Sequence, residues 1–100
     1  MSIIRHPYKD EMNKNGFIIH YLPNNIHTHG IDKTYNHLNF QLCVPLKIIY
    51  AKSLIHTLVN RIKEGMVYNT RNTYTDIITN ESIRFSLATE DGRPVLRIIL

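Results

Sequence analysis

The chain has 100 residues, of which 43% are hydrophobic and 20% charged, and its formal net charge is +4. This size and composition predict one folded domain, residues 1–100, and exclude an intrinsically disordered chain. The sequence holds no apolar run of membrane-spanning length, and its N-terminus lacks the apolar core of a signal peptide. Because Cys43 is the single cysteine, no internal disulfide can form. We therefore expect a soluble, cytoplasmic protein with no membrane partner.

The N-terminal half predicts a short helix followed by three strands. Pro7 and Gly16 are typical residues for the start and end of a helix. Beyond Gly16, alternating apolar residues and turn-forming Pro23-Asn24 predict strands. The predicted elements are a helix over 8–15, strands over 17–22, 26–31 and 38–44, and a connection over 32–37 with at most one helical turn.

The C-terminal half predicts one long helix and a β-hairpin. Apolar residues recur at steps of three and four between Pro45 and Gly65, which indicates an amphipathic helix over about residues 47–64. A short strand near 66–68 is also expected. Strands over 82–88 and 94–100 flank Asp91-Gly92, a strong signal for a tight hairpin. These elements predict an α+β domain with a mostly antiparallel, curved sheet of about five strands, one long helix packed across it and a short N-terminal helix.

Histidines concentrate in the middle of the chain. Because side chains alternate along a strand, His27 and His29 are expected on one face, and His20 can approach from the neighbouring strand. We expect no cofactor or metal, since no carboxylate or cysteine stands nearby at a recognised metal-binding spacing. If a metal does bind, the predicted ligands are His27, His29 and His37.

A polar pocket on the sheet is the main functional expectation. Imidazole and phenol rings stack on bases, and arginine binds phosphate or carboxylate in a forked geometry. The twelve Lys and Arg residues are scattered, which favours an anionic small molecule over a nucleic-acid polymer. The residues expected to bind the ligand are His20, Tyr21, His27, His29, Tyr35, His37, Gln41, Arg84 and Arg97, and Asn39 is expected to line the same pocket.

Five segments, GFIIHYL, HTHGI, NHLNFQLCVPL, RIKEGMVY and GRPVLRIIL, resemble a bacterial and phage family known only as a domain of unknown function, number four thousand two hundred and sixty-two. The resemblance covers roughly residues 13–100 and includes the H-T-H-G, H-x-x-x-Q and V-L-R-I patterns. The chain departs from the family pattern in three places. Phe17 stands where the family has tryptophan, Asn39 stands where it has an acidic residue, and the relatives continue beyond the position of Leu100. The lost carboxylate counts against metal catalysis. The resemblance implies importance for His20, Tyr21, His27, Thr28, His29, Gly30, His37, Gln41, Pro45, Gly65 and Arg97.

The leading hypothesis is a non-catalytic protein that holds an anionic, nucleotide-like small molecule on the histidine face. Arg97, with Arg84, would contact its phosphate, and a homodimer is a further expectation. A phage protein that sequesters a host immune signalling nucleotide would fit this description. One alternative is a metal-dependent or histidine-based hydrolase of the phosphoester class that uses His27, His29 and His37. A second alternative is a regulator that binds a protein partner.

Overall fold

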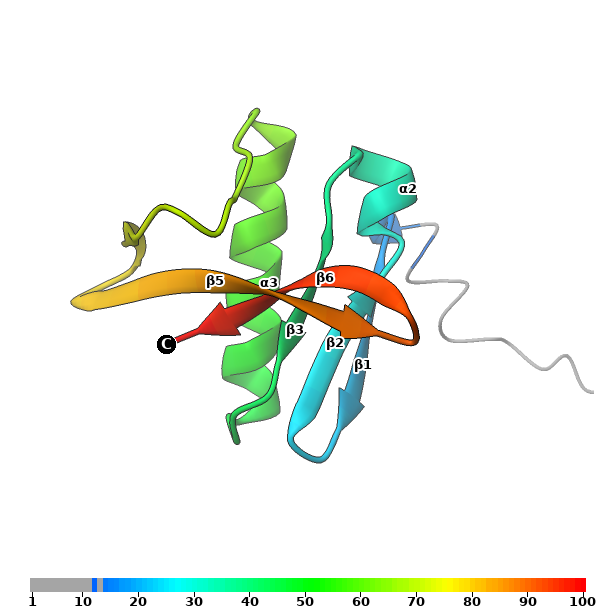
Figure 1. The fold of residues 1–100 in the computed structure, drawn as a ribbon, viewed down its shortest axis with the longest axis horizontal. Coiled ribbons are helices and arrows are strands. Elements are labelled where there is room, and N and C mark those ends of the chain that lie inside the picture. The colour runs from blue at the N-terminus through cyan, green and yellow to red at the C-terminus, as the bar shows by residue number, and fades with distance from the viewer. Residues whose placement is uncertain (1–11, 13) are drawn as a thin grey trace, which may run out of the picture.

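The computed structural model describes residues 12 and 14–100 and has an α+β fold (Figure 1). Within this part of the chain, six strands form one sheet in the order β1-β2-β3-β6-β5-β4. The strands are β1 (Ile18–Leu22), β2 (Asn25–His29), β3 (Asn39–Leu42), β4 (Tyr74–Ile78), β5 (Glu81–Glu90) and β6 (Arg93–Ile99), and the helices are α2 (Ile31–Tyr35) and α3 (Ile48–Lys63).

The sheet differs from the predicted one in strand number and direction. β3 and β6 pair in parallel, whereas every other neighbouring pair is antiparallel. A parallel pair needs a long crossover connection, and here the chain between them forms α3, β4 and β5. The threonine-rich stretch contributes β4, while residues 66–68 form a loop and no strand. The helix predicted over 8–15 falls largely outside the described residues.

The long helix was predicted nearly to its ends, and it covers one face of the sheet (Figure 1). Its buried residues follow the expected spacing of three and four: Ala51, Leu54, Ile55, Leu58, Val59 and Ile62. Against them lie side chains from the strands, among them Phe40, Leu42 and Phe85. No helix in the described part of the chain is long and apolar enough to cross a membrane.

Strand register separates an apolar face of the sheet from a polar one. Directly paired residues project from the same face, so His20 shares a face with its partner His27. His27 pairs in turn with Gln41, and Gln41 pairs with Arg97. The alternate residues of these strands belong to the core beneath α3. The polar row therefore lies on the face opposite α3.

The β5–β6 hairpin partly covers this polar face. Its turn residues Asp91 and Gly92 have φ values of 51° and 77°, and positive φ at both central positions is what the predicted tight turn requires. Long paired strands twist strongly. In Figure 1 the β5 and β6 strands cross in front of β3 and β2 near the tip of this hairpin. As a result, Glu90 reaches His27 although their strands are not neighbours in the sheet.

Candidate metal centre

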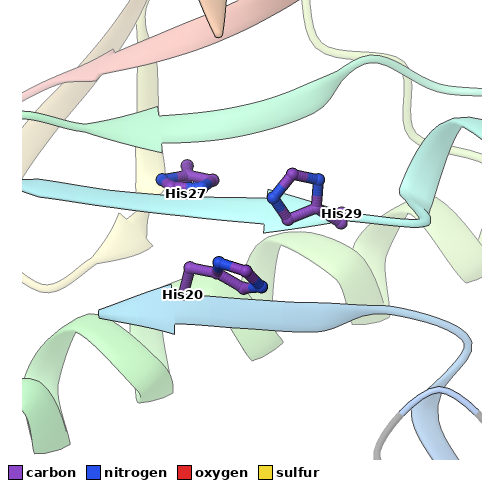
Figure 2. Close-up of side chains that lie close together, drawn as sticks. All are labelled: His20, His27 and His29. Atoms are coloured by element: carbon purple, nitrogen blue, oxygen red, sulfur yellow. The ribbon is translucent and has the colours of Figure 1, made fainter. Parts of the chain in front are cut away.

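Three histidine rings from two adjacent strands meet on the polar face of the sheet. Figure 2 shows His20 on β1 and His27 and His29 on β2, with α3 on the far side of the strands. The ring centroids lie 5.1 Å apart for His20 and His27, 4.6 Å for His20 and His29, and 4.9 Å for His27 and His29. One nitrogen atom from each ring lies within 4.8 Å of the others. We call these three residues the histidine cluster.

Local sequence explains why the cluster forms. The H-x-H spacing places His27 and His29 on one face of β2. The tight connection after β1, where Asn24 adopts a φ of 56°, sets the register that places His20 opposite His27. Both features are local, so the cluster does not depend on distant parts of the chain for its alignment.

A chain of polar contacts runs from the cluster to the neighbouring strands. The Nδ1 atom of His27 lies 3.5 Å from Oε1 of Glu90. The Nε2 group of Gln41 donates a hydrogen bond to the same Glu90 oxygen at 3.0 Å. The Nε group of Arg97 donates to Oε1 of Gln41 at 2.8 Å. Arg97 therefore orients Gln41, which in turn holds the Glu90 carboxylate beside His27.

Burial and neighbouring charges determine the protonation states of the side chains at this site. His27 is only 4% exposed, and its Nδ1 atom is buried without a hydrogen-bond partner among the residues that the structure describes. Burial, followed by the neighbouring His20 and His27 rings, lowers the pKa of His29 below its ordinary value. The hydrogen bond from Gln41 lowers the pKa of Glu90. At neutral pH the site therefore combines a neutral His29 imidazole with an ionised Glu90 carboxylate.

Thr28 and Asn39 fix the backbone beneath the cluster. The Thr28 hydroxyl accepts a hydrogen bond from the Phe40 N–H at 2.9 Å and donates one to Oδ1 of Asn39 at 3.0 Å. The same Asn39 oxygen accepts the N–H of Ile31, the first residue of α2, at 3.1 Å. These bonds connect β2, β3 and α2 at the point where the cluster ends. The asparagine at this position thus supports the fold around the site.

A pocket of about 370 Å³ lies beside the cluster. His29 and Gly30 form part of its wall, and the hairpin tip forms another part through Glu90, Asp91 and Arg93. The rest of its lining comprises Met12, Thr28, Asp32, Lys33, Asn39 and Val95. The pocket gives a small molecule access to the edge of the histidine cluster.

Five of the residues expected at the ligand site belong to the cluster or its polar contacts: His20, His27, His29, Gln41 and Arg97. Tyr21 packs on the core side, and the Tyr35 hydroxyl donates to the Asn15 carbonyl at 2.7 Å. Arg84 is an exposed residue of β5 that lines neither the cluster nor the pocket. The sequence did not indicate Glu90 and Arg93 as site residues, although the Asp-Gly turn predicted that both lie at the tip of a hairpin.

His37 does not join the cluster, and His20 takes the place that was expected for it. The His37 Nδ1 atom lies 2.8 Å from the Leu38 carbonyl oxygen, and its Nε2 atom accepts the Tyr68 N–H at 3.1 Å. The Nδ1–H tautomer satisfies both contacts, so neither ring nitrogen is left for a metal. The role of His37 is to hold the loop after α3 against the core.

Replacing His37 with phenylalanine should distinguish a structural role of this residue from a role as a metal ligand. The change keeps an aromatic ring but leaves the buried Tyr68 N–H without its acceptor, so we expect the free energy of unfolding to fall by about 1–3 kcal/mol. If the histidine cluster binds zinc, as proposed below, its affinity should be the same in this variant as in the wild type. Chemical denaturation and zinc titration of the same sample measure both quantities. A loss of zinc affinity in the folded variant would restore His37 to the ligand set.

The fold and the site together define a small α+β domain with a histidine cluster between two hairpins. No protein-family model matches the chain, and neither does any curated protein or solved structure. The resemblance to the domain of unknown function therefore stays a prediction.

Proposed function

We propose that this protein binds one divalent transition-metal ion through His20, His27 and His29. The observation that carries the proposal is the approach of three imidazole nitrogens to within 4.8 Å of one another. Around a tetrahedral zinc ion, bonds of about 2.0–2.1 Å place ligand nitrogens roughly 3.3 Å apart. Small rotations of the three side chains would bring the nitrogens to that separation. Metals bind neutral imidazole, and the lowered pKa of His29 favours that form.

The surroundings of His27 support the same proposal. A buried polar atom without a partner is costly, and the Nδ1 atom of His27 is one. In metal sites the ligating histidine commonly directs its second ring nitrogen to a carboxylate, which fixes the ring and strengthens the ligand. Glu90, 3.5 Å from Nδ1, stands in that position. A metal on Nε2 would draw the Nδ1–H and the carboxylate together.

Three protein ligands leave at least one coordination position for a small ligand. Open three-histidine sets also occur in catalytic zinc enzymes, so a metal-assisted hydrolase is the second candidate function. Binding is favoured over hydrolysis because Glu90, the carboxylate closest to His27, already accepts from Gln41. A carboxylate that is held by this hydrogen bond is better suited to orienting a metal ligand than to accepting a proton from water.

Thermal denaturation with different metals tests the proposal. Zn²⁺, Co²⁺ and Ni²⁺ should stabilise the chain, whereas Mg²⁺ and Ca²⁺ should not, because the latter prefer oxygen ligands. At a free concentration of about 100 Kd the gain is about 2.7 kcal/mol, or roughly 10–20 °C in melting temperature for a chain of this size. A chelator should reverse the shift. Equal melting temperatures with and without the three transition metals would contradict the proposal.

A further inference from the structure

The pocket beside His29 carries charges of both signs. Its acidic groups are Asp32, at the start of α2, and Glu90 and Asp91, at the hairpin tip. Its basic groups are Lys33 and Arg93. Three carboxylates against two cations leave the lining with one net negative charge. Without a metal ion, this lining opposes the entry of an anion.

A divalent ion on the histidine cluster would reverse this balance. His29 belongs both to the cluster and to the pocket wall, so a metal held there adds two positive charges at the edge of the pocket. The net charge of the lining then becomes positive. Bound metal ions are commonly the largest local charge in a site and dominate its electrostatics.

We propose that this pocket binds the phosphate group of a small molecule, and that it does so only when the metal is bound. The inference rests on the metal site proposed above and names the ligand class for its open coordination position. A phosphate monoester carries nearly two negative charges and three acceptor oxygens, so it can contact the metal, Lys33 and Arg93 at once. A carboxylate has only two oxygens and one charge. The volume of about 370 Å³ falls in the lower part of the range for small-molecule sites, which suits a mononucleotide-sized ligand.

The arginine that contacts phosphate is therefore a different one from those expected at first. Arg97 uses its Nε group to hold Gln41, and Arg84 lies outside the pocket. Arg93 lines the pocket and is the first residue of β6, where it pairs with Glu90 of β5, so the hairpin fixes its backbone. Its forked guanidinium group suits a phosphate better than a single ammonium group does.

Calorimetry with adenosine monophosphate as the probe tests the inference, with adenosine as the uncharged control. Protein loaded with one equivalent of Zn²⁺ should bind the monophosphate and not adenosine, and chelator-treated protein should bind neither. Arg93→Gln and Lys33→Gln should each weaken binding of the monophosphate by about tenfold or more, since each removes a charged hydrogen-bond donor. Zinc affinity should not change in either variant. Arg84→Gln, an equally conservative change on the same strand pair, should bind the monophosphate as the wild type does.

The outcomes separate this inference from the metal proposal. Tight zinc binding without binding of the monophosphate would overturn the inference and leave the metal site standing. Equal binding of the monophosphate to loaded and chelator-treated protein would overturn the metal dependence, and equal binding of adenosine would overturn the role of phosphate. A loss in Arg84→Gln that matches the loss in Arg93→Gln would overturn the assigned pocket. A failure of zinc to bind would overturn both proposals.

Discussion

Replacing His27 with alanine is expected to abolish specific zinc binding. His27 is the buried member of the histidine cluster, with its ring centroid 5.1 Å from that of His20 and 4.9 Å from that of His29, and its Nδ1 atom lies 3.5 Å from Glu90. Groups that only orient a metal ligand contribute about 10–100-fold to affinity, so loss of a direct ligand should cost more than about 100-fold. Competition with a chromophoric chelator measures this loss. The same variant should no longer gain melting temperature from zinc.

Two further substitutions test whether a loss of zinc binding in His27→Ala comes from the missing ligand or from disturbed packing. Because His27 is 4% exposed, its removal also disturbs packing. His20→Asn and His29→Asn change half-buried members of the cluster and should weaken zinc binding while the chain stays folded. His56→Asn is the matched control, because His56 lies on α3 with its ring 5.2 Å from that of Phe17. Zinc affinity that is the same in all four variants would show that the cluster is not the binding site.

The sequence allowed the local parts of this architecture to be predicted. Apolar spacing between Pro45 and Gly65 indicated α3 because an amphipathic helix must bury one stripe. The Asp91-Gly92 pair indicated the hairpin because few residues tolerate positive φ at both turn positions. The shared face of His27 and His29 followed from strand alternation alone. Each of these inferences depends on residues only a few positions apart.

The strand order and the contacts around the histidine cluster depend on segments that are distant in the sequence. The local alternation of side chains does not indicate that β3 pairs in parallel with β6, or that the β5–β6 hairpin brings Glu90 beside His27 of β2. Glu90 could therefore not be predicted as the partner of His27. The exclusion of His37 had the same cause, because a backbone N–H from the distant loop at Tyr68 occupies its ring. The alignment of His20 with His27, by contrast, is local to the β1–β2 hairpin.

Replacing Phe40 with alanine is expected to cause the largest loss of stability among the changes considered. Phe40 is fully buried in β3, and its ring centroid lies 5.8 Å from that of Phe85 and 5.9 Å from that of Tyr68. Truncating a buried phenylalanine typically costs about 3–5 kcal/mol, because apolar contacts are lost and a cavity remains. Chemical denaturation measures the change. Leu87→Ala is the control, since Leu87 is 66% exposed and its loss should cost no more than about 0.5 kcal/mol.

The Phe40 variant also tests whether the core and the metal site act independently. Phe40 packs beneath the sheet, whereas its backbone N–H donates to Thr28, between His27 and His29. If the truncation leaves the backbone in place, zinc at about 100 Kd should still add about 2.7 kcal/mol, which offsets most of the loss. A clearly smaller gain would mean that the truncation disturbs the histidine cluster through β3, since sites that share contacts are not additive. A loss below about 1 kcal/mol without metal would contradict the placement of Phe40 at the centre of the core.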